Sequence, residues 1–218
     1  MKDIVIYGDS SFSERMAFFV TFEQQGNIVA YTNKRDFITR ESINGVPVIP
    51  YDELDSRIDK SNVEVLIAIG YTKMNYYREE IYKDLKKKGY KVATFISMNS
   101  ILYTNSIGEG TIILPDVYVG PNVKLGVCNY LAASVKISHD SIIGDYNFLS
   151  TNVVMGGYAN IENSCFIGLN ATIRHDITLA SKTFIGSGGN LLCNTEENCI
   201  YVGNPAKKLD KKSTDVKI

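Results

Sequence analysis

An uninterrupted six-residue repeat occupies the second half of the chain. Every sixth position from Ile101 to Leu191 carries Ile, Leu, Val or Met. The next residue is often glycine, and the residue four places after the aliphatic one is often small or β-branched. Because these four aliphatic types make up roughly a quarter of the chain, chance would produce such a run on the order of once in a hundred million trials. The repeat therefore dictates how this half folds.

The periodicity is typical of a parallel β-helix, in which three short strands make one triangular turn of about eighteen residues. One aliphatic side chain per strand points inward and stacks on its equivalent in the next turn, while glycine suits the tight corners. Residues 101–196 would form about five turns. The periodicity does not give the handedness, and the usual right-handed crossover argues against a left-handed coil.

The first hundred residues follow a different pattern, in which apolar runs alternate with amphipathic ones. Ile4–Gly8 and Val63–Gly70 read as buried strands, whereas 13–25 and 75–88 read as helices. This alternation predicts a small Rossmann-like α/β domain with parallel strands, which binds ligands at the carboxyl ends of its strands. We therefore expect a domain at 1–98 and a β-helix domain with a C-terminal tail at 99–218.

The candidate ligand residues of the first domain follow its predicted strands: Ser10, Ser11, Phe12, Thr32, Asn33 and Gly70. For the two serines, an ordinary turn that caps a helix is an equally good interpretation. The loop at 8–13 has one glycine instead of a GxGxxG motif, and its Asp9 is unfavourable for a pyrophosphate. A redox dinucleotide is thus not expected.

Composition excludes several other classes of function. The 23 Lys and Arg against 24 Asp and Glu give a net charge of -1, which disfavours nucleic acid as a partner. Two histidines cannot build a three-His zinc site, and the four cysteines form no CxxC pair, so no metal is expected. No apolar run approaches the roughly 18 residues of a membrane span. We expect a cytoplasmic protein with reduced thiols.

Both histidines lie in the repeat, at the third position of their hexads. His139 and His175 are two turns apart and would lie at the same corner of the coil, roughly 9.6 Å from each other. That separation is too large for a shared metal or a catalytic pair. Each is followed by an aspartate, which could orient it as a general base. The alternative for either one is an exposed histidine with a solvated neighbour.

Several motifs resemble the sialic acid O-acetyltransferase and bacillosamine N-acetyltransferase family. They are the runs at 139–146, 156–157, 167–168, 185–188 and 201–207. The resemblance implies a sugar-nucleotide domain joined to a left-handed β-helix that works as a homotrimer. It also implies that His139 is the proton acceptor beside Asp140, that a backbone amide of Gly157 lies near the substrate carbonyl, and that Leu169 and Ser187 contact acyl-CoA.

Other features bear on the cofactor and the assembly. Lys207 opens a basic tail that would either meet the phosphates of coenzyme A or be solvated. Phe148 stands where the family often has a second histidine at the acyl site, and Thr32-Asn33 replaces paired acids. Aromatic side chains of one flank would be exposed in a lone coil and favour a trimer: Tyr118, Tyr130, Phe148, Phe166 and Phe184.

The resemblance implies an enzyme that transfers an acetyl group from acetyl-CoA. The acceptor it implies is the amino group of a nucleotide-linked sugar used in surface glycan synthesis, with His139 as general base. One alternative is O-acetylation of a sialic acid or related sugar. A second alternative is a non-catalytic β-helix that serves as a binding subunit.

Overall fold

The computed structural model describes residues 2–216, which divide into two compact units. The first unit holds the chain up to Gly70 together with Glu80–Phe95, and the second holds Tyr71–Glu79 together with the chain from Ile96 onward. A nine-residue excursion, 71–79, thus leaves the first unit and packs with the second.

The first unit contains a six-stranded sheet in the order β3-β4-β2-β1-β5-β6. The central strand β1 pairs in parallel with β2 on one side and β5 on the other, and only the short β3 runs antiparallel to its neighbour. The sheet strands are β1 (Asp3–Tyr7), β2 (Asn27–Asn33), β3 (Ser42–Ile43), β4 (Val46–Pro50), β5 (Val63–Ile67) and β6 (Lys91–Val92). The helices are α1 (Ser11–Phe22), α2 (Leu54–Arg57) and α3 (Tyr76–Lys88), of which the part up to Glu79 belongs to the second unit. There are 3-10 turns at Arg35–Phe37, at Tyr51–Glu53 and, in the second unit, at Ser213–Asp215.

Local chemistry explains the limits of α1. The side chain of Ser10 accepts a hydrogen bond from the Phe12 amide and so caps the helix, which starts two residues earlier than the sequence predicts. The helix ends before Gln24, whose φ of 53° is left-handed.

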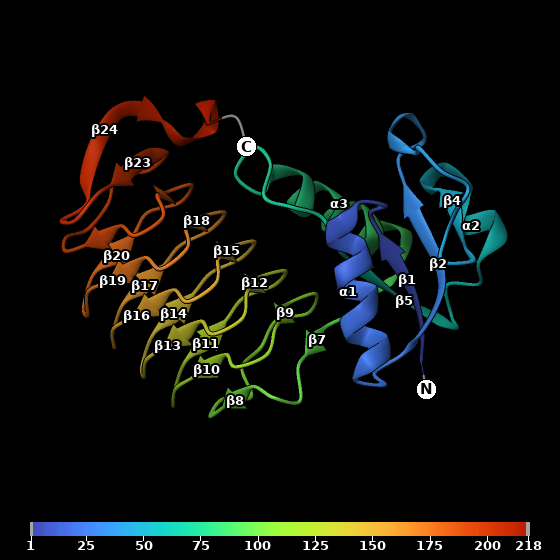
Figure 1. Cartoon of the computed structure of the whole chain (residues 1–218), viewed down its shortest axis with the longest axis horizontal. Coiled ribbons are helices and arrows are strands. Elements are labelled where there is room, and N and C mark those ends of the chain that lie inside the picture. The colour runs from blue at the N-terminus through green and yellow to red at the C-terminus, as the bar shows by residue number, and fades with distance from the viewer. Residues whose placement is uncertain (1, 217–218) are drawn as a thin grey trace. The chain divides into compact units, whose positions relative to one another are not determined.

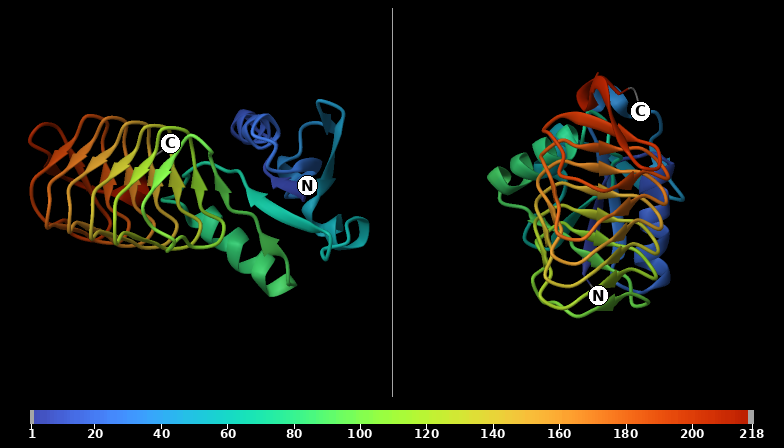
Figure 2. Two further views of the ribbon diagram at one scale, coloured as in Figure 1. Left: turned by 90° about the horizontal axis from the view of Figure 1, so that it is seen from below. Right: turned by 90° about the vertical axis from the view of Figure 1, so that its left-hand side faces the viewer.

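The second unit is a left-handed parallel β-helix with three faces (Figure 1; Figure 2). From Ile112 to Leu191, paired two-residue strands are 18 residues apart, as Tyr118 and Lys136 are. The first face holds β8 (Ile101–Leu102), β10 (Tyr118–Val119), β13 (Lys136–Ile137), β16 (Val154–Met155), β19 (Thr172–Ile173) and β22 (Asn190–Leu191). The second face holds β11 (Lys124–Leu125), β14 (Ile142–Ile143), β17 (Asn160–Ile161) and β20 (Thr178–Leu179). The third face holds β7 (Phe95–Ile96), β9 (Ile112–Ile113), β12 (Tyr130–Leu131), β15 (Phe148–Leu149), β18 (Phe166–Ile167), β21 (Phe184–Ile185), β23 (Cys199–Val202) and the antiparallel β24 (Lys207–Lys212).

The repeated aliphatic side chains form the core of the coil. Those from Ile113 to Leu191 are all buried in a single cluster. The expectation fails at Ile101, which is 56% exposed and pairs with the outward Tyr118, while Leu102 pairs with the inward Val119. Since adjacent strand residues face opposite sides, a one-residue offset turns Ile101 outward.

The three faces meet at three corners, which we name by the face that precedes each of them. The first corner holds 120–123, 138–141, 156–159, 174–177 and 192–195, and the third holds 168–171 and 186–189 among others. At most corners one residue has a left-handed backbone, with φ between 52° and 62° from Asp116 to Lys182. Asn, Asp and Gly adopt that conformation at least cost.

The aromatic residues expected to line one flank divide between two faces. Tyr118 lies on the first face, whereas Tyr130, Phe148, Phe166 and Phe184 stack along the third. The chain covers this stack itself, because the Tyr71 ring lies 4.7 Å from Phe148 and 4.3 Å from Phe166. Tyr130, Phe148 and Phe166 are each only 7% exposed. The inference of a trimer from exposed aromatics is therefore wrong for this face.

Among the described residues, no helix has the length and apolar character needed to cross a bilayer.

Candidate functional site

His139 and Asp140 lie together at the first corner of the coil. The imidazole Nδ1 is 2.8 Å from Asp140 Oδ2, and the His139 side chain is 50% exposed. An ionised carboxylate can only accept a hydrogen bond, so Nδ1 carries the proton and the lone pair of the neutral ring is on Nε2. The pair thus presents a basic nitrogen at the surface of the coil.

Neighbouring residues of the same corner keep Asp140 ionised. The Asn122 amide donates to Asp140 Oδ1 at 2.9 Å, from one turn earlier in the coil. Hydrogen bonds from Asn122, from the His139 imidazole and from the Tyr158 hydroxyl hold the pKa of Asp140 below its usual value. A carboxylate fixed in this way orients the imidazole and stabilises its protonated form during a proton transfer.

Gly157 occupies the next turn directly beside His139. A Cβ at this position would lie 2.7 Å from His139 Cε1 and 2.8 Å from Nε2, so only glycine leaves room for the ring as it stands. The Gly157 carbonyl accepts from the Asp176 amide at 3.0 Å, whereas its own N–H donates no hydrogen bond to a described residue. A backbone N–H that makes no other hydrogen bond is a suitable donor for an oxyanion. Here that N–H belongs to the residue packed against the imidazole of His139.

The structure separates His139 from the other candidate nucleophiles and bases. His175 is exposed one turn beyond Gly157, and the exposed Cys193 lies one turn further on. Three turns separate Cys193 from His139, about 14 Å, which precludes a pair between these two residues. Burial raises the pKa of the Cys165 thiol to about 12, so Cys165 is not a nucleophile either. Within residues 2–216, no group of three or more His, Cys, Asp or Glu side chains is placed to hold a metal.

The residues expected to contact acyl-CoA gather along the third corner. Leu169 and Ser187 occupy equivalent positions in successive turns, and both are exposed. The Asn190 amide donates to the Gly203 carbonyl, which places the turn before Lys207 over the end of the same corner. Lys207 pairs with Val202 at the start of β24 and is exposed. Leu169, Ser187 and Lys207 thus share one edge of the coil, which the whole first face separates from His139.

Phe148 does not fit the expected contact with acyl-CoA. It lies on the third face, across the coil from the first corner, and Tyr71 covers its ring. With 7% of its surface exposed, Phe148 offers little area to a ligand. In this chain the residue packs the coil against the 71–79 segment.

The acceptor-side candidates gather at the carboxyl ends of β1, β2 and β5 in the first unit. Gly8 lies against β5, because a Cβ there would be 2.5 Å from the Ala68 carbonyl oxygen, and its N–H donates to the Thr32 carbonyl at 2.8 Å. The Asn33 amide donates to Asp9 Oδ1 at 2.7 Å. Thr32 is fully buried and Phe12 is half-buried, whereas Ser10, Ser11 and Gly70 are exposed. Ser10 also caps α1, as the alternative interpretation requires.

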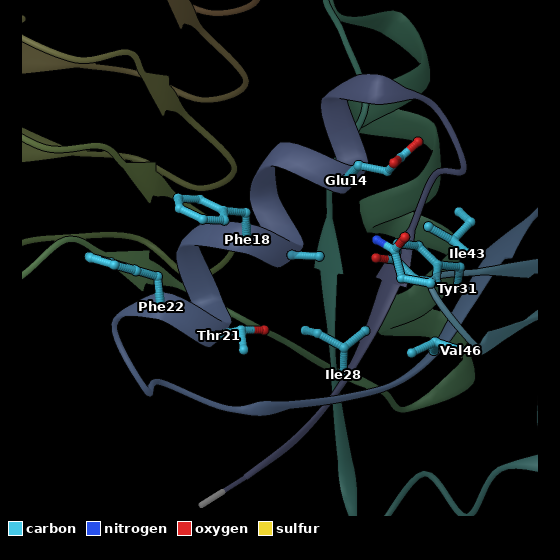
Figure 3. A pocket seen from close by; sticks show the side chains of 10 residues that line it. Glu14, Phe18, Thr21, Phe22, Ile28, Tyr31, Ile43 and Val46 are labelled. Atoms are coloured by element: carbon cyan, nitrogen blue, oxygen red, sulfur yellow. The ribbon is translucent and has the colours of Figure 1, made fainter.

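A separate hollow in the first unit lies between α1 and the β2–β4 region (Figure 3). Its volume is about 410 Å³, and the exposed, stacked rings of Phe18 and Phe22 border it. None of the acceptor-side candidates lines this hollow. The sequence gives no reason to expect it.

The six-residue repeat does not predict two residues that contact the His139–Asp140 pair, Asn122 and Tyr158. Both follow from reading the sequence in steps of eighteen, since Asn122, Asp140 and Tyr158 are equivalent positions in three successive turns. An eighteen-residue comparison would therefore have found them.

The chain was compared with family models, with curated proteins and with solved structures. No family model matches the chain. The GDP-perosamine N-acetyltransferase of Escherichia coli O157:H7 is 26% identical over 146 residues, which cover 64% of this chain and 66% of that protein. The chain thus spans just under two thirds of the length of the E. coli protein. It spans less than half of the length of several other curated relatives.

Solved structures align over nearly the full chain. The acetyltransferase domain of PglB from Neisseria gonorrhoeae, in complex with acetyl coenzyme A, has a TM-score of 0.84 at 21% identity and covers 95% of this chain and 99% of its own. WeeI from Acinetobacter baumannii has a TM-score of 0.85 at 25% identity and covers 96% of this chain and 100% of its own. With its α/β unit and its left-handed coil, this chain has the fold of these hexapeptide-repeat acetyltransferase structures and is similar in sequence to a sugar N-acetyltransferase.

Proposed function

We propose that the protein transfers the acetyl group of acetyl-CoA to the amino group of a nucleotide-linked amino sugar. The observation that carries this proposal is the His139–Asp140 pair beside the Gly157 amide at one corner of the coil. Support for the donor comes from the PglB domain solved with acetyl-CoA, and support for the acceptor class from the relative named as a GDP-perosamine N-acetyltransferase.

In the proposed reaction, the acceptor nitrogen attacks the thioester carbonyl carbon while His139 Nε2 takes a proton from that nitrogen. A C–N bond forms and the carbonyl becomes an oxyanion, which the Gly157 N–H stabilises. The C–S bond then breaks, and the leaving thiolate takes the proton from the imidazolium. Asp140 accepts a hydrogen bond from Nδ1 throughout and balances the transient positive charge on the ring.

The alternative acceptor is a sugar hydroxyl, as in O-acetylation of a sialic acid. The same base and oxyanion donor would serve that reaction, since either acceptor must lose a proton. The name of the Escherichia coli relative favours nitrogen. A non-catalytic β-helix would have no use for the glycine that makes room for the His139 ring, which favours an enzyme.

The positions of the two corners support a homotrimer as part of the proposal. Within one coil, the first face separates His139 from Leu169, Ser187 and Lys207. If acyl-CoA binds along the third corner, its thioester reaches His139 most directly when the third corner of one copy packs beside the first corner of another. Such head-to-tail contacts close into a ring of three. The acceptor-side residues of the first unit would bind the nucleotide of the sugar nucleotide.

We expect inactive variants to restore activity to each other across this interface. His139→Ala lacks the base, and Leu169→Glu places an anion where the phosphates and arm of the coenzyme would bind. Co-expressed, differently tagged and purified through both tags, the mixed oligomers should recover about a third of wild-type activity, because some sites inherit both intact corners. His139→Ala mixed with His139→Ala/Leu169→Glu is the matched control and should stay inactive. A monomer by sedimentation, or no recovery in the mixed oligomers, would refute the shared site.

A panel of acceptors tests the chemistry itself. Release of free thiol from acetyl-CoA is followed with GDP-, UDP- and dTDP-linked amino sugars, with their hydroxyl counterparts, and with sialic acids. The proposal predicts thiol release with at least one amino sugar and none with its hydroxyl counterpart. Release with sialic acid alone would establish O-acetylation instead, and no release with any acceptor would favour a binding subunit.

A further inference from the structure

Tyr158 occupies a backbone position that does not suit a tyrosine. Its φ is 58°, in the left-handed region that costs a bulky residue more than Asn or Asp. The equivalent residues of the same corner with left-handed φ are Asn122, Asp140 and Asp176. Tyr158 is therefore the exception at its corner, and it stands beside the proposed base.

Burial of the side chain does not explain why a tyrosine stands at position 158. Tyr146, at the corresponding position of the second corner, is 8% exposed and contributes to the packing of the coil, whereas Tyr158 is 57% exposed. Within a single chain, this exposed aromatic ring therefore contributes little to the packing of the coil. Its contacts indicate another reason for its presence.

Those contacts are made with the two side chains of the proposed base. The ring of Tyr158 meets the His139 imidazole edge to face, with centroids 5.2 Å apart and an interplanar angle of 88°. Its hydroxyl contributes, after Asn122 and the His139 imidazole, to the lowered pKa of the Asp140 carboxyl. The Tyr158 amide also donates to the His139 carbonyl at 3.1 Å, which ties the two turns together at this point.

We propose that Tyr158 is a positioning residue for the His139–Asp140 pair. The ring limits rotation of the imidazole on the side that Asp140 does not hold, and the hydroxyl fixes the carboxylate that orients Nδ1. Together with Gly157, which makes room for the ring, Tyr158 confines His139 to one rotamer in which Nε2 is free. This inference rests on the proposed function, because orientation of Nε2 matters only if His139 is the base.

The discriminating variant is Tyr158→Asn. Asparagine suits the left-handed backbone but removes both the ring and the phenol, so the melting temperature should stay equal or rise. The kcat should fall at least tenfold with the KM for acetyl-CoA unchanged, since binding along the third corner is untouched. Tyr158→Phe keeps the ring and should retain an intermediate kcat. Lys182→Asn, the same kind of exchange at the second corner, should leave kcat unchanged.

The measurements use the full chain, with acetyl-CoA as donor and GDP-perosamine, or the preferred amino sugar of the panel, as acceptor. A spectroscopic arm needs no acceptor: the chain has two histidines, so the NMR spectrum contains two sets of imidazole signals. Loss of the adjacent ring current in Tyr158→Asn should shift one set and leave the other in place.

Three results would overturn the inference. One is a Tyr158→Asn variant with wild-type kcat, provided that His139→Ala is inactive. The second is two unshifted sets of imidazole signals. The third is a fall in melting temperature that accounts for the lost activity, which would make Tyr158 structural. If His139→Ala keeps wild-type kcat, the proposed base itself is wrong, and the role of Tyr158 falls with it.

Discussion

Replacement of His139 by alanine is expected to lower kcat by about two to four orders of magnitude, the contribution typical of a general base. The substitution removes the acceptor for the proton of the attacking amine and leaves the coil intact, because the imidazole is half exposed and contributes little to the core. The KM for acetyl-CoA should change little, since the candidate coenzyme residues lie at another corner. Steady-state kinetics on the purified variant, with circular dichroism as a check on folding, measures the effect.

His175 provides the matched control for this experiment. It is the other histidine of the chain, stands at the same corner two turns away, and is likewise followed by an aspartate. His175→Ala should keep kcat within about a factor of two of the wild type, a change of less than 0.5 kcal/mol. Equal losses from the two substitutions would contradict the assignment of the base.

The second large effect is expected from Gly157→Ala. The added methyl group would lie 2.7 Å from His139 Cε1 and 2.8 Å from Nε2, so the imidazole has to move. A displacement of about 1 Å in a reacting group costs roughly a hundredfold in rate, and we expect kcat to fall by that factor. The backbone N–H remains in this variant, so the loss reports the position of the ring and not the loss of an oxyanion donor.

A double variant separates this steric effect from a general disturbance of the corner. In a His139→Ala background there is no ring to displace, so Gly157→Ala should cause no further fall in kcat. The same fold loss in both backgrounds would show that the methyl group acts elsewhere, for instance on the acceptor. Unfolding in urea, compared across the four proteins, checks that each is folded.

The β-helix was predictable because its signal repeats. Each inward aliphatic residue stacks on its equivalent eighteen residues away, so a single packing rule is written many times in the sequence. The prediction fails at Ile101, where the coil begins and a one-residue offset turns the side chain outward. At the end of a repeat, one fewer neighbouring turn constrains the register.

The cover over the third face could not be read from the repeat. Tyr71 belongs to an excursion of the first hundred residues, and its contact with Phe148 and Phe166 joins positions far apart in the chain. Such long-range packing leaves no periodic trace. Phe148 therefore looked like an exposed residue near the acyl site, although the structure shows it buried.

The candidate site was predictable in part. His139, Asp140 and Gly157 were identified from local motifs, and the structure places all three together because residues eighteen apart are neighbours in the coil. Tyr158 was missed because the motif that carries the resemblance does not include it. Its unusual backbone position becomes visible only once the equivalent residues of each turn are compared.

The most direct measurement is mass analysis of the products formed from acetyl-CoA and a nucleotide-linked amino sugar. With the wild-type protein, we predict free coenzyme A and an acceptor heavier by one acetyl group, with the acetyl on nitrogen, as tandem fragmentation or resistance to mild alkali would show. His139→Ala should yield neither product above the uncatalysed background. An unmodified acceptor with every amino sugar of the panel, or full product formation by His139→Ala, would contradict the account.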